Sequence, residues 1–372
     1  MSRFRFQIAK PGDDAELREF IRKVSMPGTI QLSSEREPSY FDALAVEGSD
    51  SEVLVCRDEQ TGRVVATGNR SIKSMYVNGN PVPVGYLSGL RIDEAARNGR
   101  VLYAGYQFLR EIHADGRAPF YLTTIMEGNV AAKKLFVKPR SRLPYYHDCG
   151  RYECMALSFR RRSAEAPSRS GICIRPATAY DARMIVDFLH SQGKCRQFFP
   201  VYQADDFASL NGLLKGLFWE SVFLAFKDGE LVGTMAAWDQ RHFRQWRISG
   251  YGGWMKLMRF PYNLLALLSG VPRLPRSGDA LDFFILSLIC VRKDDRRVFS
   301  ALLDEIVREN EGHYSFFLAG MHESDSLLQE LRGFSQHYPF PSRLHVVSWE
   351  EDEDWFTKLE SSRIPYLELG SL

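Results

Sequence analysis

The sequence predicts an α/β (α+β) protein made of two fused copies of one strand–helix unit. Three observations predict it: a strand–loop–helix stretch at 87–112, an internal repeat, and a length of 372 residues, which exceeds one ordinary core. Hydrophobic residues make up 45% and charged residues 25% of the chain, as in ordinary globular proteins. We therefore expect two globular domains.

Each copy of the repeat opens with a strand, a proline turn and a helix. The two openings are FQIAKPGDDAELREFI at 6–21 and CIRPATAYDARMIVDFL at 173–189. Asp13 or Asp14 can cap the first helix, and Asp181 lies in the first turn of the second. A hairpin then follows in each copy. These hairpins are expected at 53–68 and 223–238, with turns at a Thr–Gly and an Asp–Gly pair.

The late elements of the copies also match, but the second copy carries an insert. FYLTTIMEGN at 120–129 corresponds to FFLAGMHESD at 316–325, and the extra residues are 252–279. The insert is aromatic and basic, with a helical apolar run at 262–268. We favour a packed insertion helix; a lid and a dimer contact stay open, and a membrane-surface helix is the least favoured.

The repeat sets the expected domain organisation. We expect an N-terminal domain over 1–160, a linker over 161–171, a C-terminal domain over 172–350 and a tail over 351–372. The linker is rich in Arg, Ser, Ala and Pro and has no apolar periodicity.

Composition argues against several classes of function. A net charge of +2, from 48 basic and 46 acidic residues, gives no case for general nucleic-acid binding. The six cysteines are scattered with no C-x-x-C pair, so neither a metal site nor a disulfide framework is expected. The first residues lack the apolar stretch of a signal peptide, and no long apolar run predicts a membrane span. We therefore expect a cytoplasmic protein; its oligomeric state is not predicted.

The 87–112 stretch has the form of a phosphate site. A short apolar run ends at Ile92, a polar loop with Arg97 and Arg100 follows, and a helix starts near Val101. Unpaired N–H groups and the dipole at a helix start favour an anion. The alternative is an ordinary strand-to-helix loop with solvated arginines.

This loop, with the strand 120–127 and a helix from Asn129, resembles the acetyl-CoA-binding half of the GCN5-related N-acetyltransferase superfamily. The family's pyrophosphate loop reads Arg/Gln-x-x-Gly-x-Gly/Ala. Counted from Arg97, its glycine positions hold Arg100 and Leu102 here. The resemblance implies two GNAT-like domains, each with a mixed, mostly antiparallel sheet and a splayed parallel strand pair flanked by helices.

The first half is the expected cofactor half. In the second half, the corresponding loop at 289–306 has no glycine near the helix start. Asp294 and Asp295 stand where phosphates would lie, and carboxylates there would repel a pyrophosphate. Capping of the helix by Asp294 or by Asp295 is the better explanation.

The resemblance implies acetyl-CoA, or another acyl-CoA, as cofactor. Main-chain groups of Leu90, Arg91 and Ile92 would contact the pantetheine, and Asn129 would lie beside the pantetheine arm. The loop amides for the pyrophosphate would come from Arg97, Asn98, Gly99, Arg100, Val101 and Leu102. Asn129 can equally cap its helix.

Acyl transfer to an amine needs a base and an acid. The family's frequent Tyr on the late helix falls on Phe136, which cannot donate a proton. Glu127, Tyr146 and Tyr86 are the main candidates, and Ser88, Tyr145 and His147 are also considered. Against each stands a structural role, as a solvated strand end or a core aromatic, and a water relay would need none of them.

The sequence thus favours an acyl-CoA-dependent N-acyltransferase acting on an amine of an unknown small-molecule or peptide acceptor. One alternative is a non-catalytic tandem GNAT fold that binds a ligand or partner. Another is an aminoacyl transferase that uses charged tRNA, which the near-zero net charge disfavours.

Overall fold

The computed structural model describes residues 3–24, 29–97, 99–129, 132, 143–160, 171–208, 212–269, 274–334, 338–349 and 354–372. The strands are β1 (Phe4–Ile8), β2 (Ile30–Glu35), β3 (Asp50–Asp58), β4 (Val64–Val77), β5 (Asn80–Ile92), β6 (Tyr121–Met126), β7 (Tyr145–Leu157), β8 (Ile172–Pro176), β9 (Phe199–Pro200), β10 (Val222–Lys227), β11 (Glu230–Trp238), β12 (Gln245–Tyr251), β13 (Phe283–Val291), β14 (Phe316–His322), β15 (Tyr338–Pro339) and β16 (Ser342–Ser348). The α-helices are α1 (Asp14–Lys23), α2 (Arg100–His113), α4 (Ala182–Gly193), α5 (Ala204–Ala208), α6 (Met255–Ser269), α7 (Arg296–Asn310), α8 (Leu328–Arg332) and α9 (Trp355–Lys358).

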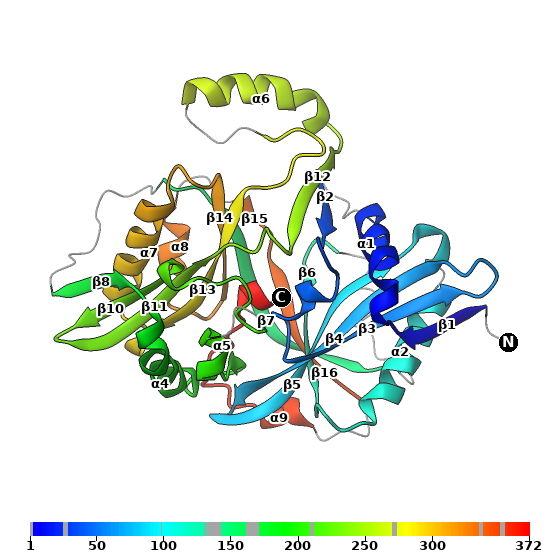
Figure 1. Ribbon diagram of the computed structural model, residues 1–372, viewed down its shortest axis with the longest axis horizontal. Helices are drawn as coiled ribbons and strands as arrows, with labels where there is room; N and C mark the ends of the chain where they lie inside the picture. The colour runs from blue at the N-terminus through cyan, green and yellow to red at the C-terminus, as the bar shows by residue number, and fades with distance from the viewer. Residues whose placement is uncertain are drawn as a thin grey trace.

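One mixed sheet runs through both halves of the molecule (Figure 1). Its order is β1-β3-β4-β5-β6-β16-β7-β14-β13-β11-β10-β8. The late strand β16 lies between β6 and β7, and β7 pairs with β14 of the second half. The halves therefore exchange their last strands. The domains at 1–160 and 172–350 stay a prediction, because strand pairing crosses from one to the other.

Helices cover both faces of the sheet in each half, which confirms the expected α/β class. In the first half, α1 buries Leu17 and Ile21 against Val53, while α2 buries Leu109 on the side that Leu54 faces. Neighbouring strand residues point to opposite faces, so β3 contributes side chains to the cores on both faces of the sheet. In the second half, α4 and α7 lie on opposite faces in the same way.

The expected hairpins form, and their turns explain the glycines. β3 pairs antiparallel with β4, and β10 pairs antiparallel with β11. Asp228 and Gly229, between β10 and β11, have φ of 53° and 82°, the left-handed conformations that a tight hairpin turn requires. The helix expected near Val101 begins at Arg100. Of the helix expected from Asn129, only Ala132 lies among the described helical residues, and Phe136 lies outside them.

The expectation of a packed helix in the insert 252–279 is wrong. Helix α6 stands at the far end of a two-stranded ribbon formed by β2 and β12 (Figure 1). Leu257 and Phe260 are each 81% exposed, so the apolar face of α6 is not buried against the body.

The tail after α9 returns to the middle of the molecule (Figure 1). Tyr152 of β7 donates a hydrogen bond of 2.7 Å to the carbonyl of Leu367, and Gln240 donates one of 2.6 Å to Gly370. The tail therefore packs against strands of both halves.

Candidate functional site

The parallel strands β5 and β6 separate after two residue pairs. Their register covers Gly85–Tyr121 and Tyr86–Leu122. One further contact follows, from the Thr123 hydroxyl to the Leu87 carbonyl at 2.8 Å. Beyond that point β6 continues its pairing with β16, while β5 continues along β4. The first half therefore has the splayed parallel pair expected from its sequence.

Strand β5 carries a bulge beside this splay. The pairing of β5 with β4 shifts between Thr67 and Asn69. Gly89, opposite this shift, has φ of 64°, and a Cβ there would lie 2.4 Å from the side-chain nitrogen Nδ2 of Asn69. The next residue, Leu90, is 43% exposed. A bulge leaves main-chain groups out of the ladder, so it offers hydrogen-bonding groups at the splay.

The loop after β5 delivers the start of helix α2 to the same place. Gly99 precedes the helix with φ of 77°, and Arg97 and Arg100 are exposed. Val101 and Leu102 are buried and anchor the first turn. This is the cationic helix start that the sequence predicts. Asn98 lies outside the described residues.

Two of the expected main-chain contacts already have side-chain donors. Arg91 donates a hydrogen bond of 3.0 Å to the Leu90 carbonyl, and Arg97 donates one of 3.2 Å to the Ile92 carbonyl. A pantetheine arm at β5 would therefore compete with these arginines for the same oxygens.

The two candidates at the end of β6 have structural partners. Glu127 forms an ion pair with Arg151 of β7, at 3.1 Å between Oε1 and Nε. Asn129 accepts a hydrogen bond of 3.0 Å from the Ala132 amide, which is the contact of a helix cap.

Tyr86 and Tyr146 lie on opposite faces of the sheet. Tyr86 packs with the core that includes Leu122 and Val346, whereas Tyr146 packs beside Tyr106 of α2. The Tyr86 hydroxyl lies 3.0 Å from that of Thr124 on β6, so it bridges the two strands as they part. Burial raises the pKa of Tyr86 and that of Tyr146, which keeps both phenols protonated at neutral pH.

A buried polar cluster, which sequence reasoning missed, backs the bulge. Glu47 accepts hydrogen bonds from Ser88 of β5, from Arg36 at 2.9 Å and from Arg244 at 2.6 Å. Asn69 donates a 3.1 Å hydrogen bond to Ser88. Glu47 is fully buried and lies in a segment outside the strands and helices. It belongs to no sequence motif, and a glutamate after the apolar run ALAV was the only sign of a buried carboxylate.

The equivalent splay in the second half has its main-chain donor bonded by the chain itself. β13 and β14 pair in parallel over Phe283–Ile285 and then part. Leu288 has φ of 49° and stands where the first half has its bulge. Its amide donates a 2.9 Å hydrogen bond to Glu368 of the tail. A tail carboxylate therefore takes a main-chain donor of the second splay.

An ion cluster lies at the loop end of that splay. Arg196 binds Asp294, and it binds Asp325 at 2.8 Å. Asp295 caps α7 by accepting a 2.9 Å hydrogen bond from the backbone amide of Arg297, which confirms the expected capping. A cavity of about 270 Å³ remains between β13, β14 and tail residues 362–367.

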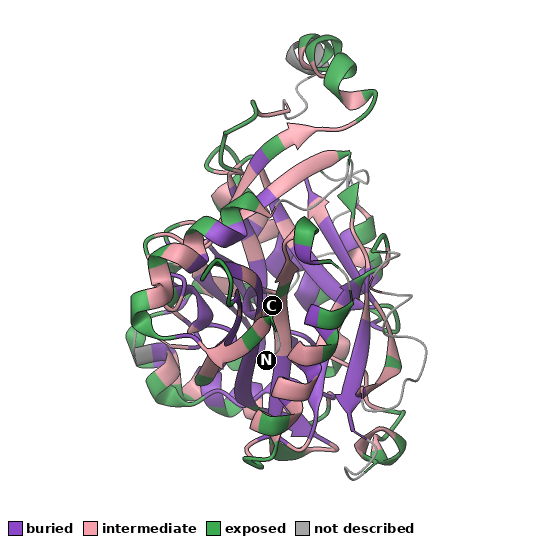
Figure 2. Cartoon of the chain, turned by 90° about the vertical axis from the view of Figure 1, so that its right-hand side faces the viewer, coloured by how far each residue is buried: buried purple, intermediate pink, exposed green. Residues whose placement is uncertain are grey.

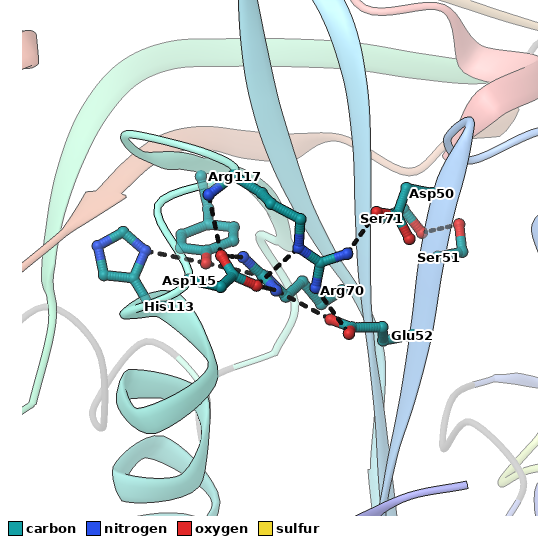
Figure 3. Close-up of polar contacts among 9 residues, drawn as sticks. Asp50, Ser51, Glu52, Arg70, Ser71, His113, Asp115 and Arg117 are labelled. Carbon is teal, nitrogen blue, oxygen red and sulfur yellow. Dashed lines mark hydrogen bonds and ion pairs between the residues drawn. The ribbon is translucent and has the colours of Figure 1, made fainter. Parts of the chain in front are cut away.

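A buried ion network fixes the base of the first splay (Figure 3). Arg70 is fully buried and donates two hydrogen bonds to Asp115, of 2.6 and 2.8 Å, and one of 2.9 Å to Glu52. Its Nε donates a 3.0 Å hydrogen bond to the hydroxyl of Tyr121, the first residue of β6. The network ties the end of α2 to β3, β4 and β6.

Comparison with known proteins identifies the fold. No family model matches the sequence, and no curated protein matches it. Among solved structures, N-myristoyltransferase of Saccharomyces cerevisiae with bound myristoyl-CoA is similar at a TM-score of 0.60 and 10% identity, over 99% of this chain and 90% of that one. A GCN5-related glucosamine N-acetyltransferase region of a fungal multi-domain β-N-acetylglucosaminidase reaches 0.61 at 10% identity, over 93% of this chain and 38% of that one.

A bacterial protein gives a similar match. A probable N-acyltransferase of Enterococcus faecalis has a TM-score of 0.51 and 10% identity, over 92% of this chain and 72% of that one. At such identities the likeness shows the fold alone. The resemblance noted in the sequence is confirmed at that level: this chain has the tandem fold of GCN5-related N-acetyltransferases.

Proposed function

We propose that this protein is an acyl-CoA-dependent N-acyltransferase whose first half binds the acyl-CoA. The difference between the two splays carries this proposal. The first splay ends in an exposed bulge residue, Leu90, and the cationic start of α2. The second has its bulge amide bonded to Glu368 and its loop aspartate bonded to Arg196. The first splay thus offers an exposed bulge residue and a cationic helix start, whereas the corresponding amide and loop aspartate of the second are bonded within the chain.

In this proposal the bulge and the loop divide the cofactor between them. Main-chain groups around Leu90 bind the pantetheine arm. Amides of the first turn of α2 bind the pyrophosphate, with Arg97 and Arg100 adding positive charge. The donor's acyl chain is left to experiment; acetyl-CoA is the first to test.

The acid of the reaction is proposed to be Tyr86. Its protonated hydroxyl bridges β5 and β6 at the point where the thioester would enter the splay. It would donate a proton to the departing thiolate. On the same strand Ser88 is bonded to Glu47, which gives the acceptor amine a hydroxyl–carboxylate route for losing its proton. Glu127 and Tyr146 are left out of this scheme, because Glu127 follows the end of β6, beyond the Tyr86–Thr124 contact, and Tyr146 lies on the other face.

A non-catalytic ligand-binding protein is the second candidate. The arginine side chains on the carbonyls of Leu90 and Ile92 favour it, because they satisfy groups that a cofactor would use. A turnover assay separates the two. The protein is incubated with acetyl-CoA, and in parallel with myristoyl-CoA, and with a panel of amines, and the released thiol is measured. We expect release that depends on the amine; binding of an acyl-CoA without release under any pairing would favour the second candidate.

A further inference from the structure

Helix α6 is held away from the body of the molecule. It follows β12, whose only described strand partner is β2, and this ribbon lifts the helix beyond the main sheet (Figure 1). The same separation is plain from the side, where the described part of α6 is largely exposed (Figure 2). Even with residues 278–281 bonded along the other edge of β12, so narrow a ribbon gives a helix little surface on which to pack.

The polar side of α6 faces its own return segment. Arg259 donates a 3.0 Å hydrogen bond to the Pro275 carbonyl. Asn263 donates one of 2.9 Å to the Leu274 carbonyl and accepts one of 2.7 Å from the Leu274 amide. These contacts fix which face of the helix turns inward.

The apolar side faces outward. Leu257, Phe260 and Leu264 are 81%, 81% and 56% exposed, and they follow the i, i+3, i+7 spacing of one helix face. Trp254, just before the helix, is 63% exposed. A globular helix normally buries such a stripe, so this face is built to meet an apolar phase outside the chain.

The charge of the insert indicates which apolar phase this face meets. Residues 252–279 contain four cations and one acidic residue, Asp279; the cations are Lys256, Arg259, Arg273 and Arg276. Basic residues beside an apolar face, with a tryptophan near its edge, suit the surface of a bilayer with anionic lipids. Two copies of the same segment would instead bring like charges together. No helix among the described residues is long and apolar enough to span a bilayer.

We propose that α6 docks this protein on the surface of an anionic lipid bilayer. Leu257, Phe260 and Leu264 enter the boundary between headgroups and acyl chains, and the exposed Lys256 and Arg276 meet the lipid phosphates. The ribbon of β2 and β12 joins the docked helix to the body. This inference is independent of the proposed enzymatic activity, because it concerns only the insert.

Vesicle co-sedimentation tests the proposal. The full chain is mixed with vesicles of phosphatidylcholine alone, or with phosphatidylglycerol added. We expect binding to the anionic vesicles and about tenfold weaker binding to the neutral ones. The Leu257→Glu, Phe260→Glu variant should lose binding to both. Tyr180→Glu is the matched control, since Tyr180 is fully exposed in the second half, and this variant should bind as the native chain does.

Three results would overturn the proposal. The first is native protein that stays in the supernatant with anionic vesicles. The second is a double variant that still binds these vesicles. The third is a native dimer in sedimentation velocity that becomes a monomer in the double variant, with no vesicle binding, which would assign the face to a second copy of the chain. Circular dichroism of both variants, expected to match the native spectrum because the altered side chains are exposed, excludes misfolding.

Discussion

Lys73 is a buried lysine on β4. Its side chain lies near Glu47, Glu368 and Arg244, and burial, the largest cause, lowers its pKa to about 8. An unfolded lysine titrates near pH 10.4, so the unfolded chain binds more protons than the folded chain between these values. Burying the ammonium therefore costs stability below pH 8, and stability rises as the pH increases from 8.

Replacing this lysine tests that reading. Lys73→Met should raise the free energy of unfolding at pH 7 by on the order of 3 kcal/mol, the free energy that corresponds to the lowered pKa of Lys73. Its stability should also lack the rise between pH 8 and 9.5. Urea titrations of both proteins across this range measure the difference. Equal slopes with pH would show that Lys73 is not the group responsible.

Tyr86 is the residue on which the proposed acid step depends. Tyr86→Phe removes the hydroxyl that meets Thr124 and keeps the ring in its core. We expect kcat to fall about a hundredfold, because general acid catalysis contributes at least that much, with acyl-CoA affinity unchanged. The half-exposed Tyr103 on α2 gives a control in Tyr103→Phe. A kcat equal to that of the control would remove Tyr86 from the mechanism.

At the scale of elements, α2 must be held so that its start meets the bulge of β5. The network around Arg70 does this from the opposite end of the helix (Figure 3). Hydrogen bonds from Arg70, the largest cause, hold the pKa of Asp115 well below its usual range. Asp115 therefore adds stability above the unfolded pKa near 3.9, and the contribution is lost progressively as the pH falls below it.

Asp115→Asn should cost about 2 kcal/mol at pH 7, less than a fully buried pair because Glu52 still neutralises Arg70. The variant should also lose less stability than the native chain between pH 5 and pH 3, a window set by the unfolded pKa of about 3.9. Thermal unfolding followed by circular dichroism gives both quantities. If the native chain and the variant lost equal stability between pH 5 and pH 3, Asp115 would not be the group that stabilises the native chain above this range.

At the scale of the whole molecule, the tail joins the halves by bonding to β7 and to the second splay. Glu368→Ala should leave the Leu288 amide unpaired and cost about 2 kcal/mol, typical of a lost buried partner. Amide exchange followed by mass spectrometry should speed up along β13 and β14, while β5 and β6 keep their protection. Equal loosening of both splays would mean that the tail holds the entire fold rather than one half.

The sequence was sufficient for the local architecture. The Asp228–Gly229 turn, the strand ending at Ile92 and the cap at Asp295 each follow from short-range chemistry, and each is present. Periodicity and turn signals act over a few residues, so they identify hairpins and helix ends without knowledge of the rest of the chain.

What the sequence could not reveal depends on contacts between distant segments. β16 lies between β6 and β7, a pairing that no local pattern encodes. Glu47 and Glu368 act through partners far along the chain, so neither shows a motif. The exposed face of α6 could not be predicted either, because the same apolar spacing normally marks a buried helix.

The most direct test of the central claim is calorimetric titration with acetyl-CoA, repeated with myristoyl-CoA, on the native chain and two charge-reversal variants. Arg97→Glu, Arg100→Glu alters the first loop, and Lys293→Glu, Arg297→Glu makes the same change at exposed positions of the second. The account predicts binding that the first variant weakens about a hundredfold, because repulsion replaces attraction at the pyrophosphate, while the second variant binds as the native chain does. Binding lost only in the second variant, or no binding of either acyl-CoA by the native chain, would contradict it.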